Sequence, residues 1–148
     1  MKNIRLTKKR TIPYRYAPKG LTKSDRKKQL KSIKLGINRP KIKSYKSKRS
    51  SWTVQFQKKY ETKISDYNFI NKNLLSKKGI NLILNKGRAA YYTSGSRPNQ
   101  TAESWARARL ASVLMYGPAF KVDKNIAEKY GKKKWLKNKP KMLTKKKI

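Results

Sequence analysis

The size and sign of its charge constrain this chain more than any single motif does. Lysines and arginines number 42 against six aspartates and glutamates, which leaves a formal net charge of +36. Self-repulsion of that size opposes a compact state unless a counter-charge is present. A polyanion is therefore the expected partner. Nucleic acid is the commonest polyanion, and an anionic membrane surface is the second candidate.

The distribution of charge divides the 148 residues into four stretches. Residues 1–20 contain prolines that favour extended geometry, so they predict a basic extended arm. Residues 21–63 form a basic helical region. Residues 64–131 hold four of the six acids and are expected to form the compact core, and residues 132–148 form a basic C-terminal tail. We predict a mainly α fold, namely a small helical domain with extended, highly basic N- and C-terminal arms.

The absence of histidine and cysteine removes several kinds of chemistry. Disulfides, thiolate nucleophiles, the usual zinc sites and imidazole bases are excluded. The six acids are spread out, which makes a nuclease metal cluster hard to build. We therefore predict no enzyme, no catalytic residue, no cofactor, no metal and no small-molecule substrate.

No stretch of the sequence predicts insertion into a membrane. The longest uncharged, apolar-rich run, Leu110–Phe120, has eleven residues and is too short to cross a bilayer. No signal-peptide pattern opens the chain. The expected location is inside a cell or a virion.

Two helices are predicted in the basic first half. Thr22 and Asp25 form a capping-box-like pair, and Gly36 is a typical stop, so a helix should lie between them. Its many cations favour a face that contacts phosphate over one that is only solvated. Ser50 or Ser51 should cap a second helix, to about residue 63, whose aromatic stripe is expected in the core and comprises Trp52, Phe56 and Tyr60.

The next segment is predicted to be broken by its glycines. Ser65 should cap a helix through Lys78 that Gly79 ends. The following "INLILNKG" is either a two-turn helix or a buried strand, because periodicity alone does not decide between them. Gly87 is expected to end this piece, and "RAAYYTS" then appears extended.

The stretch "YYTSGSRPNQTAESWARARL", Tyr91 to Leu110, contrasts with its lysine-rich surroundings. Gly95 permits a sharp turn, and Asn99 or Thr101 should cap a helix that runs to about Tyr116. The polar loop at that positive helix end either grips phosphate oxygens or only braces the fold. Trp105 and Arg109 are one turn apart, so the guanidinium could stack on the indole.

The candidate nucleic-acid contacts are cations and hydrogen-bond donors at predicted helix ends, on basic helix faces or in the tail. The C-terminal cluster among them also resembles a nuclear-import signal. The candidates are Lys27, Lys28, Lys31, Lys46, Lys48, Arg49, Arg88, Ser96, Arg97, Asn99, Arg109, Lys132, Lys133 and Lys134.

Four pieces of the sequence carry a resemblance to a known family. They are "RYAPKGLTKSDRKKQLKSI", "RPKIKSYKSKRSSW", "GINLILNKGRAAYYTSGSRPNQTAESWARARLAS" and "GPAFKVDKNIAEKY", which together span about Tyr14 to Tyr130. The chain resembles a family of small basic proteins of giant DNA viruses of algae and protists, with relatives in large phages. That family is described as a domain of unknown function. The resemblance implies a viral source and a virion or viral-chromatin setting.

Together these features predict a non-enzymatic viral protein that binds nucleic acid through phosphate contacts, DNA rather than RNA. It would be a virion component that neutralises or organises packaged DNA. It would also occupy the cytoplasm or nucleus of the host cell during assembly. One alternative is a minor capsid or internal cement protein whose basic arms bind acidic capsid subunits. Another is a ribosomal-type RNA-binding protein.

Overall fold

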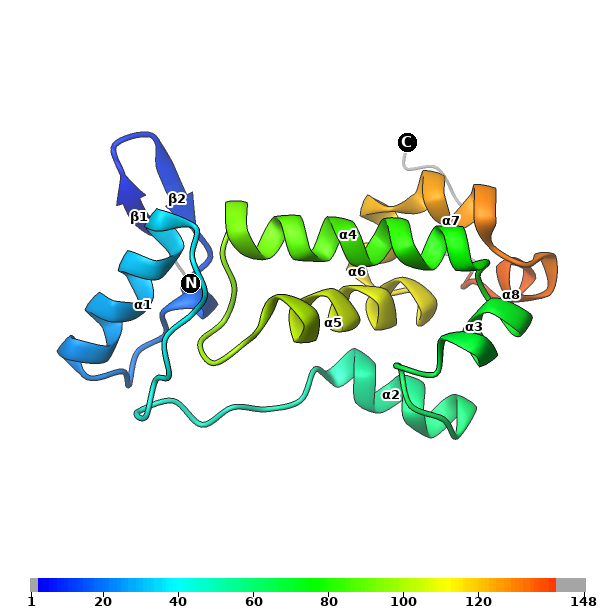
Figure 1. The fold of residues 1–148 in the computed structure, drawn as a ribbon, viewed down its shortest axis with the longest axis horizontal. Helices are drawn as coiled ribbons and strands as arrows, with labels where there is room; N and C mark the ends of the chain where they lie inside the picture. The colour runs from blue at the N-terminus through cyan, green and yellow to red at the C-terminus, as the bar shows by residue number, and fades with distance from the viewer. Residues whose placement is uncertain (1–2, 141–148) are drawn as a thin grey trace. The chain divides into compact units, whose positions relative to one another are not determined.

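The structure, a computed structural model, describes residues 3–140 and is mainly helical, as the sequence predicts (Figure 1). A short antiparallel hairpin and a 3-10 turn precede eight α-helices in this range. In chain order the elements are β1 (Ile4–Thr7), β2 (Arg10–Ile12), η1 (Tyr14–Tyr16), α1 (Lys23–Leu35), α2 (Ser51–Tyr60), α3 (Tyr67–Asn73), α4 (Lys77–Thr93), α5 (Ala102–Leu114), α6 (Pro118–Val122), α7 (Lys124–Tyr130) and α8 (Lys133–Lys137).

Packing divides the chain into two compact units that do not follow its order. Unit 1 comprises residues 1–48 and 88–105, and unit 2 comprises residues 49–87 and 106–148. Helices α4 and α5 each contribute residues to both units. These boundaries differ from those drawn from charge, because packing joins segments that are distant in sequence.

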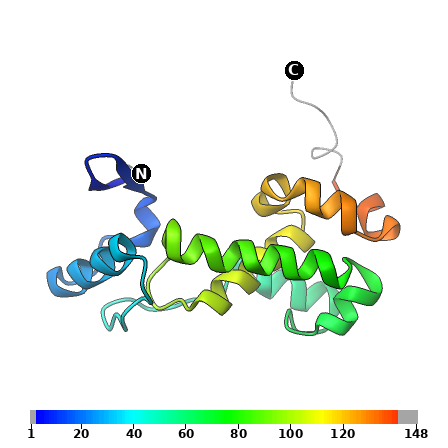
Figure 2. The same cartoon turned by 45° about the horizontal axis from the view of Figure 1, so that its top comes forward.

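Unit 1 begins with the β1–β2 hairpin, in which Ile4 pairs with Ile12 (Figure 2). Ile12 is buried with Tyr16 and Ile33 of α1, and Trp105 packs against this small core. The extended N-terminal arm predicted from the sequence is therefore not confirmed. Apolar residues at alternate positions give the hairpin one apolar face, which packs against the small core. The free energy gained from this packing outweighs the tendency of the prolines to keep the segment an isolated extended arm.

Helix α1 has the ends that its sequence predicts. The Thr22 hydroxyl accepts a hydrogen bond from the Asp25 amide at 3.1 Å, and Gly36 ends the helix with a left-handed φ of 67°. The Thr22 amide, which in a full capping box would donate to the side chain at position 25, donates to the Ser44 hydroxyl at 3.1 Å. The Asp25 carboxylate accepts instead from the hydroxyl of Ser44 at 2.6 Å and from its amide at 3.0 Å.

Unit 2 contains the larger apolar core. Helix α2 faces it with the predicted aromatic stripe: Phe56 is fully buried, and Trp52 and Tyr60 pack around it. Helices α3 to α8 supply the rest of the cluster, and its largest members include Leu110 and Phe120. Within residues 3–140, no helix is both long enough and apolar enough to cross a membrane.

Two of the glycines predicted to stop helices, Gly79 and Gly87, lie inside α4 instead. This single helix replaces the predicted short element and the extended "RAAYYTS". A Cβ on Gly79 would lie 2.7 Å from Cβ of Tyr130, and one on Gly87 would lie 2.6 Å from Cα of Ala106. Both glycines therefore permit close helix packing, which the sequence alone does not show.

The helix predicted from Ser65 to Lys78 is shorter and is capped by Asp66, whose carboxylate accepts from the Phe69 amide.

Helix α5 begins as predicted. The turn before it passes through Gly95, which has a φ of 106°. The Thr101 hydroxyl accepts from the Ser104 amide at 3.0 Å, and the Ser104 hydroxyl accepts in return from the Thr101 amide at 2.9 Å. This reciprocal pair satisfies two exposed amides at the helix start.

The described part of the predicted C-terminal tail is folded rather than free. Residues 133–137 form α8, and Trp135 is only 2% exposed. Its indole Nε1 donates to the Leu114 carbonyl at 3.0 Å, and its ring stacks on Tyr116 with centroids 5.6 Å apart. Residues 141–148 of the predicted tail lie outside the described residues. Composition predicts a basic arm here because one buried tryptophan changes an average over many lysines very little.

Candidate phosphate-binding surface

A row of lysines runs along α1. Lys23, Lys27, Lys31 and Lys34 are all exposed, and their spacing places them within one quarter of the helix circumference. The buried side of the helix carries Gln29, Ser32 and Ile33 instead. We call these four lysines the α1 lysine row. At 1.5 Å per residue the row extends over about 16 Å, which is long enough to follow several phosphates of one strand.

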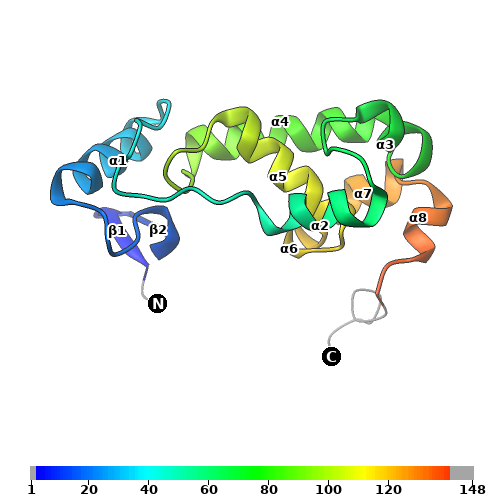
Figure 3. The ribbon, with the colours of Figure 1, turned by 90° about the horizontal axis from the view of Figure 1, so that it is seen from below.

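A second basic element of unit 1 has no regular secondary structure but is held at several points. The 39–47 segment lies within the extended stretch that follows α1 (Figure 3). The Tyr91 hydroxyl accepts from the Arg39 amide at 2.8 Å. The Asn99 side chain accepts from the Ile42 amide at 2.7 Å and donates to its carbonyl at 3.0 Å. Ser44 is bound by Asp25, and these hydrogen bonds lower the pKa of the Asp25 carboxyl.

Arg39 is a buried cation without a carboxylate partner among the described residues. It is 9% exposed, and its guanidinium lies 4.5 Å from the centre of the Tyr91 ring. One nitrogen, Nη2, donates to the Ile37 carbonyl at 2.5 Å. Its Nε and Nη1 have no hydrogen-bond partner within residues 3–140. Burial lowers the pKa of the guanidinium, but an arginine stays charged in proteins, so this site keeps an uncompensated positive charge.

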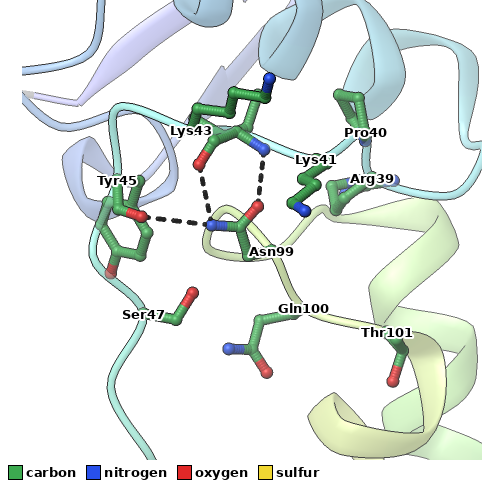
Figure 4. Close-up of a pocket in the computed structure, with 10 residues that line it drawn as sticks. Arg39, Pro40, Lys41, Lys43, Tyr45, Ser47, Asn99, Gln100 and Thr101 are labelled. Carbon is green, nitrogen blue, oxygen red and sulfur yellow. Dashed lines mark hydrogen bonds between the residues drawn. The ribbon is translucent and has the colours of Figure 1, made fainter.

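An open pocket of about 680 Å³ lies between the 39–47 segment and the start of α5 (Figure 4). Three of its ten lining residues are cationic, and none of the ten carries a carboxylate. In Figure 4 the Ser47 hydroxyl and the Gln100 amide extend from opposite walls toward each other, and the Lys41 ammonium extends toward Asn99. The lining residues are Arg39, Pro40, Lys41, Ile42, Lys43, Tyr45, Ser47, Asn99, Gln100 and Thr101.

The loop before α5, residues 94–101, braces the fold at most of its positions. Ser96 is fully buried, and its carbonyl accepts from Gln29 at 3.1 Å. Asn99 holds the 39–47 segment and has a positive φ of 62°. Arg97 is exposed and available to a partner. Ser96 and Asn99 therefore brace the fold. Contact with phosphate, the other role predicted for this loop, remains a prediction for Arg97.

The contrast between Arg97 and Asn99 is testable. Arg97→Ala should leave the unfolding midpoint in urea unchanged and reduce the magnitude of the salt slope of polyanion binding by about 0.9, the contribution of one phosphate contact. Asn99→Ala leaves the Ile42 amide and carbonyl without these partners, so it should lower the free energy of unfolding by about 1–3 kcal/mol. Equal destabilisation by both variants would show that Arg97 also braces the loop.

The remaining candidate residues fall into two groups. Arg88 and Arg109 are in ion pairs: Arg88 binds Glu103 within unit 1, and Arg109 binds both carboxylate oxygens of Asp123 at 2.8 Å within unit 2. The predicted stacking of Arg109 on Trp105 is therefore replaced by an ion pair, and the Trp105 ring meets Tyr16 edge-on at 5.8 Å. The exposed candidates are Lys27, Lys28, Lys31, Lys46 and Lys48 in unit 1 and Arg49, Lys132, Lys133 and Lys134 in unit 2.

Four further exposed lysines are not among the candidates chosen from the sequence: Lys23, Lys34, Lys41 and Lys43. The first two belong to the α1 lysine row, on the helix whose cations are predicted to contact phosphate. Lys41 and Lys43 alternate with buried Ile42, so the pattern "RPKIK" contained their signal. Nothing local to Arg39 predicts its burial, because Tyr91 is 52 residues away.

Comparison with known proteins identifies the family but not an activity. The chain belongs to a family described as "Family of unknown function (DUF5824)", whose model matches residues 13–130. This confirms a domain of unknown function over almost the range from which the sequence predicts one. No curated protein and no solved structure matches the chain.

Proposed function

We propose that this protein is a non-enzymatic nucleic-acid-binding protein that contacts phosphates with little sequence preference and neutralises or organises packaged DNA. The single observation that carries this proposal is the excess of 36 positive charges. Even if every acid neutralised one cation, 36 cations would still need counter-ions. Releasing the counter-ions condensed on DNA makes such a surface bind strongly at low salt.

The arrangement of unit 1 supports the proposal. The α1 lysine row is a regular cationic face, and the 39–47 segment is held in place by side-chain hydrogen bonds. Asp25, the acidic residue of α1, already accepts hydrogen bonds from Ser44. The resemblance of the Tyr91–Leu110 stretch to proteins of giant DNA viruses supports a virion as the setting, with the host cytoplasm or nucleus as the site of assembly.

Duplex DNA binding should show the salt dependence of multiple phosphate contacts. About 6–10 contacts are expected, each contributing roughly −0.9 to the slope of log K against log salt. Fluorescence anisotropy with two duplexes of unrelated sequence, between 50 and 300 mM NaCl, measures this slope. The two duplexes should bind alike, because phosphate contacts carry no sequence information. A slope smaller in magnitude than about 3 would indicate that the cations serve protein partners such as capsid subunits.

The same assay tests the α1 lysine row directly. A triple variant of the row should reduce the magnitude of the slope by about 2.7, since each lysine accounts for roughly 0.9. This variant carries Lys27→Gln, Lys31→Gln and Lys34→Gln. The matched control is Lys58→Gln/Lys63→Gln/Lys72→Gln, which removes the same charge from exposed positions of unit 2. If both triple variants lose the same affinity and slope, the row is not a preferred contact surface and only net charge matters.

A further inference from the structure

The pocket beside Asn99 differs from the exposed lysine surfaces because its walls are held in position. The Tyr91 hydroxyl joins both walls: it accepts from the Arg39 amide at 2.8 Å and donates to the Gln100 carbonyl at 2.8 Å. Asn99 joins them again through Ile42. A flexible chain loses entropy when it binds a ligand, so a segment already held in place binds with a smaller loss.

The polar groups around this pocket suit a phosphate. Lys41 supplies an ammonium, and Ser47 and Gln100 supply a hydroxyl and an amide (Figure 4). The side-chain oxygen Oε1 of Gln100 accepts from the Ser104 hydroxyl at 2.7 Å, which orients the side-chain nitrogen of Gln100 away from Ser104. Donors and cations without a competing carboxylate are the combination that phosphate oxygens require.

The charge of Arg39 strengthens this preference. The guanidinium is buried in unit 1, and two of its nitrogens have no hydrogen-bond partner in the described chain. Water screens a buried cation less than an exposed lysine, so it adds positive potential to the pocket that it lines. An anion bound in the pocket would supply the counter-charge that the described residues do not provide.

We propose that this pocket is a discrete site for one nucleotide, held by its phosphate group. Lys41, Ser47 and Gln100 contact the phosphate oxygens, and Arg39 contributes through its charge. The volume of about 680 Å³ is larger than one phosphate needs, and the pocket is open to solvent, so a sugar and base can extend from the bound phosphate. The phosphate comes either from a free nucleotide or from the 5′ end of a strand. This site does not depend on the proposed binding along duplex DNA.

Isothermal titration at 150 mM NaCl tests the site with adenosine 5′-monophosphate, inorganic pyrophosphate and adenosine. The two phosphate ligands should bind with 1:1 stoichiometry, and adenosine should bind at least about tenfold more weakly because it lacks the charged group. Equal binding of adenosine, or a phosphate titration that does not saturate, would overturn the proposal. A short oligonucleotide with and without a 5′-phosphate then distinguishes the two sources. A site for strand ends should bind the phosphorylated oligonucleotide more tightly than the unphosphorylated one and more tightly than adenosine 5′-monophosphate. A site for free nucleotides should bind adenosine 5′-monophosphate at least as tightly as the phosphorylated oligonucleotide.

Variants locate the binding. Lys41→Gln should lower the affinity for adenosine 5′-monophosphate at least about tenfold, as expected for the loss of a charge-assisted hydrogen bond. The control Lys72→Gln makes the same charge change in unit 2 and should alter the affinity less than about twofold. Ser47→Ala is a second, smaller change on the same wall and should weaken binding in the same direction. Equal affinities for the Lys41 and Lys72 variants would place the ligand elsewhere.

Duplex DNA binding by the same variants separates this inference from the proposed function. If the pocket fails to bind a nucleotide but the salt slope on duplex DNA is steep, only the pocket inference is wrong. If the pocket binds a nucleotide and duplex DNA binds weakly with a shallow slope, the pocket stands and the proposed function is wrong.

Discussion

Trp135→Ala should lower the free energy of unfolding by about 3–5 kcal/mol, the usual cost of truncating a buried tryptophan. The ring is 2% exposed, lies edge-on to Phe120 with centroids 5.9 Å apart and stacks on Tyr116. Its removal also leaves the Leu114 carbonyl without the indole donor. Urea unfolding followed by circular dichroism, compared at equal m-values, measures the change.

Val122→Ala is the control for this variant, because Val122 is an apolar residue of unit 2 that is 71% exposed. It should change the free energy of unfolding by less than about 0.5 kcal/mol. Trp135→Phe keeps an aromatic ring and should fall between the two. If Trp135→Ala and Val122→Ala have the same midpoint, α8 is a solvated tail, as the charge pattern alone suggested.

Asp123→Ala should destabilise unit 2 by about 3 kcal/mol, the lower end of the cost of removing one partner of a buried ion pair. The Asp123 side chain is completely buried, whereas that of Arg109 is 22% exposed and partly reaches water. The hydrogen bond to Asp123 raises the pKa of the Arg109 guanidinium. An arginine stays protonated in proteins even without such a partner, so its charge remains after Asp123 is removed. The midpoint of urea unfolding at constant m-value measures this loss.

Glu128→Ala removes the same formal charge from a pair whose carboxylate is exposed, and it serves as the control. Glu128 lies 3.8 Å from Lys139 and its side chain is 47% exposed, so the loss should be about 0–1 kcal/mol. Similar midpoints for the two variants would mean that the net charge of the chain, rather than the buried pair, determines the stability of unit 2.

The parts of the fold that depend on neighbouring residues were predictable. Thr22 and Gly36 define α1, and Thr101 caps α5, because capping uses side chains within three or four residues of the helix end. The aromatic stripe of α2 follows from the same local periodicity. These features need no knowledge of the partner that a helix packs against.

Features that depend on distant residues were not predictable. Gly79 and Gly87 were interpreted as helix stops, but Tyr130 and Ala106 approach them so closely that a Cβ would not fit. Arg109 was paired with Trp105 by spacing along one helix, while its partner Asp123 lies 14 residues further on. Local propensity cannot identify a contact that forms only after the chain has folded back on itself.

The candidate site divides in the same way. Lys27 and Lys31 were predicted because a cationic helix face is visible in the sequence, and they are exposed as expected. Ser96 and Asn99 were grouped with them as hydrogen-bond donors, but they hold the backbone of unit 1 through Gln29 and Ile42. A polar residue in a loop has the same sequence signal whether it contacts a ligand or its own chain.

The interleaving of the two units has a consequence for synthesis on the ribosome. The first 48 residues emerge before residues 88–105, which supply Tyr91, Ser96 and Asn99 to the same unit. Unit 1 therefore cannot be completed until residue 105 has been made, by which time the whole of residues 49–87 has been translated. Neither unit is a continuous stretch of translated sequence, so the nascent chain must delay burial of its first core while its cations are already exposed to any RNA nearby.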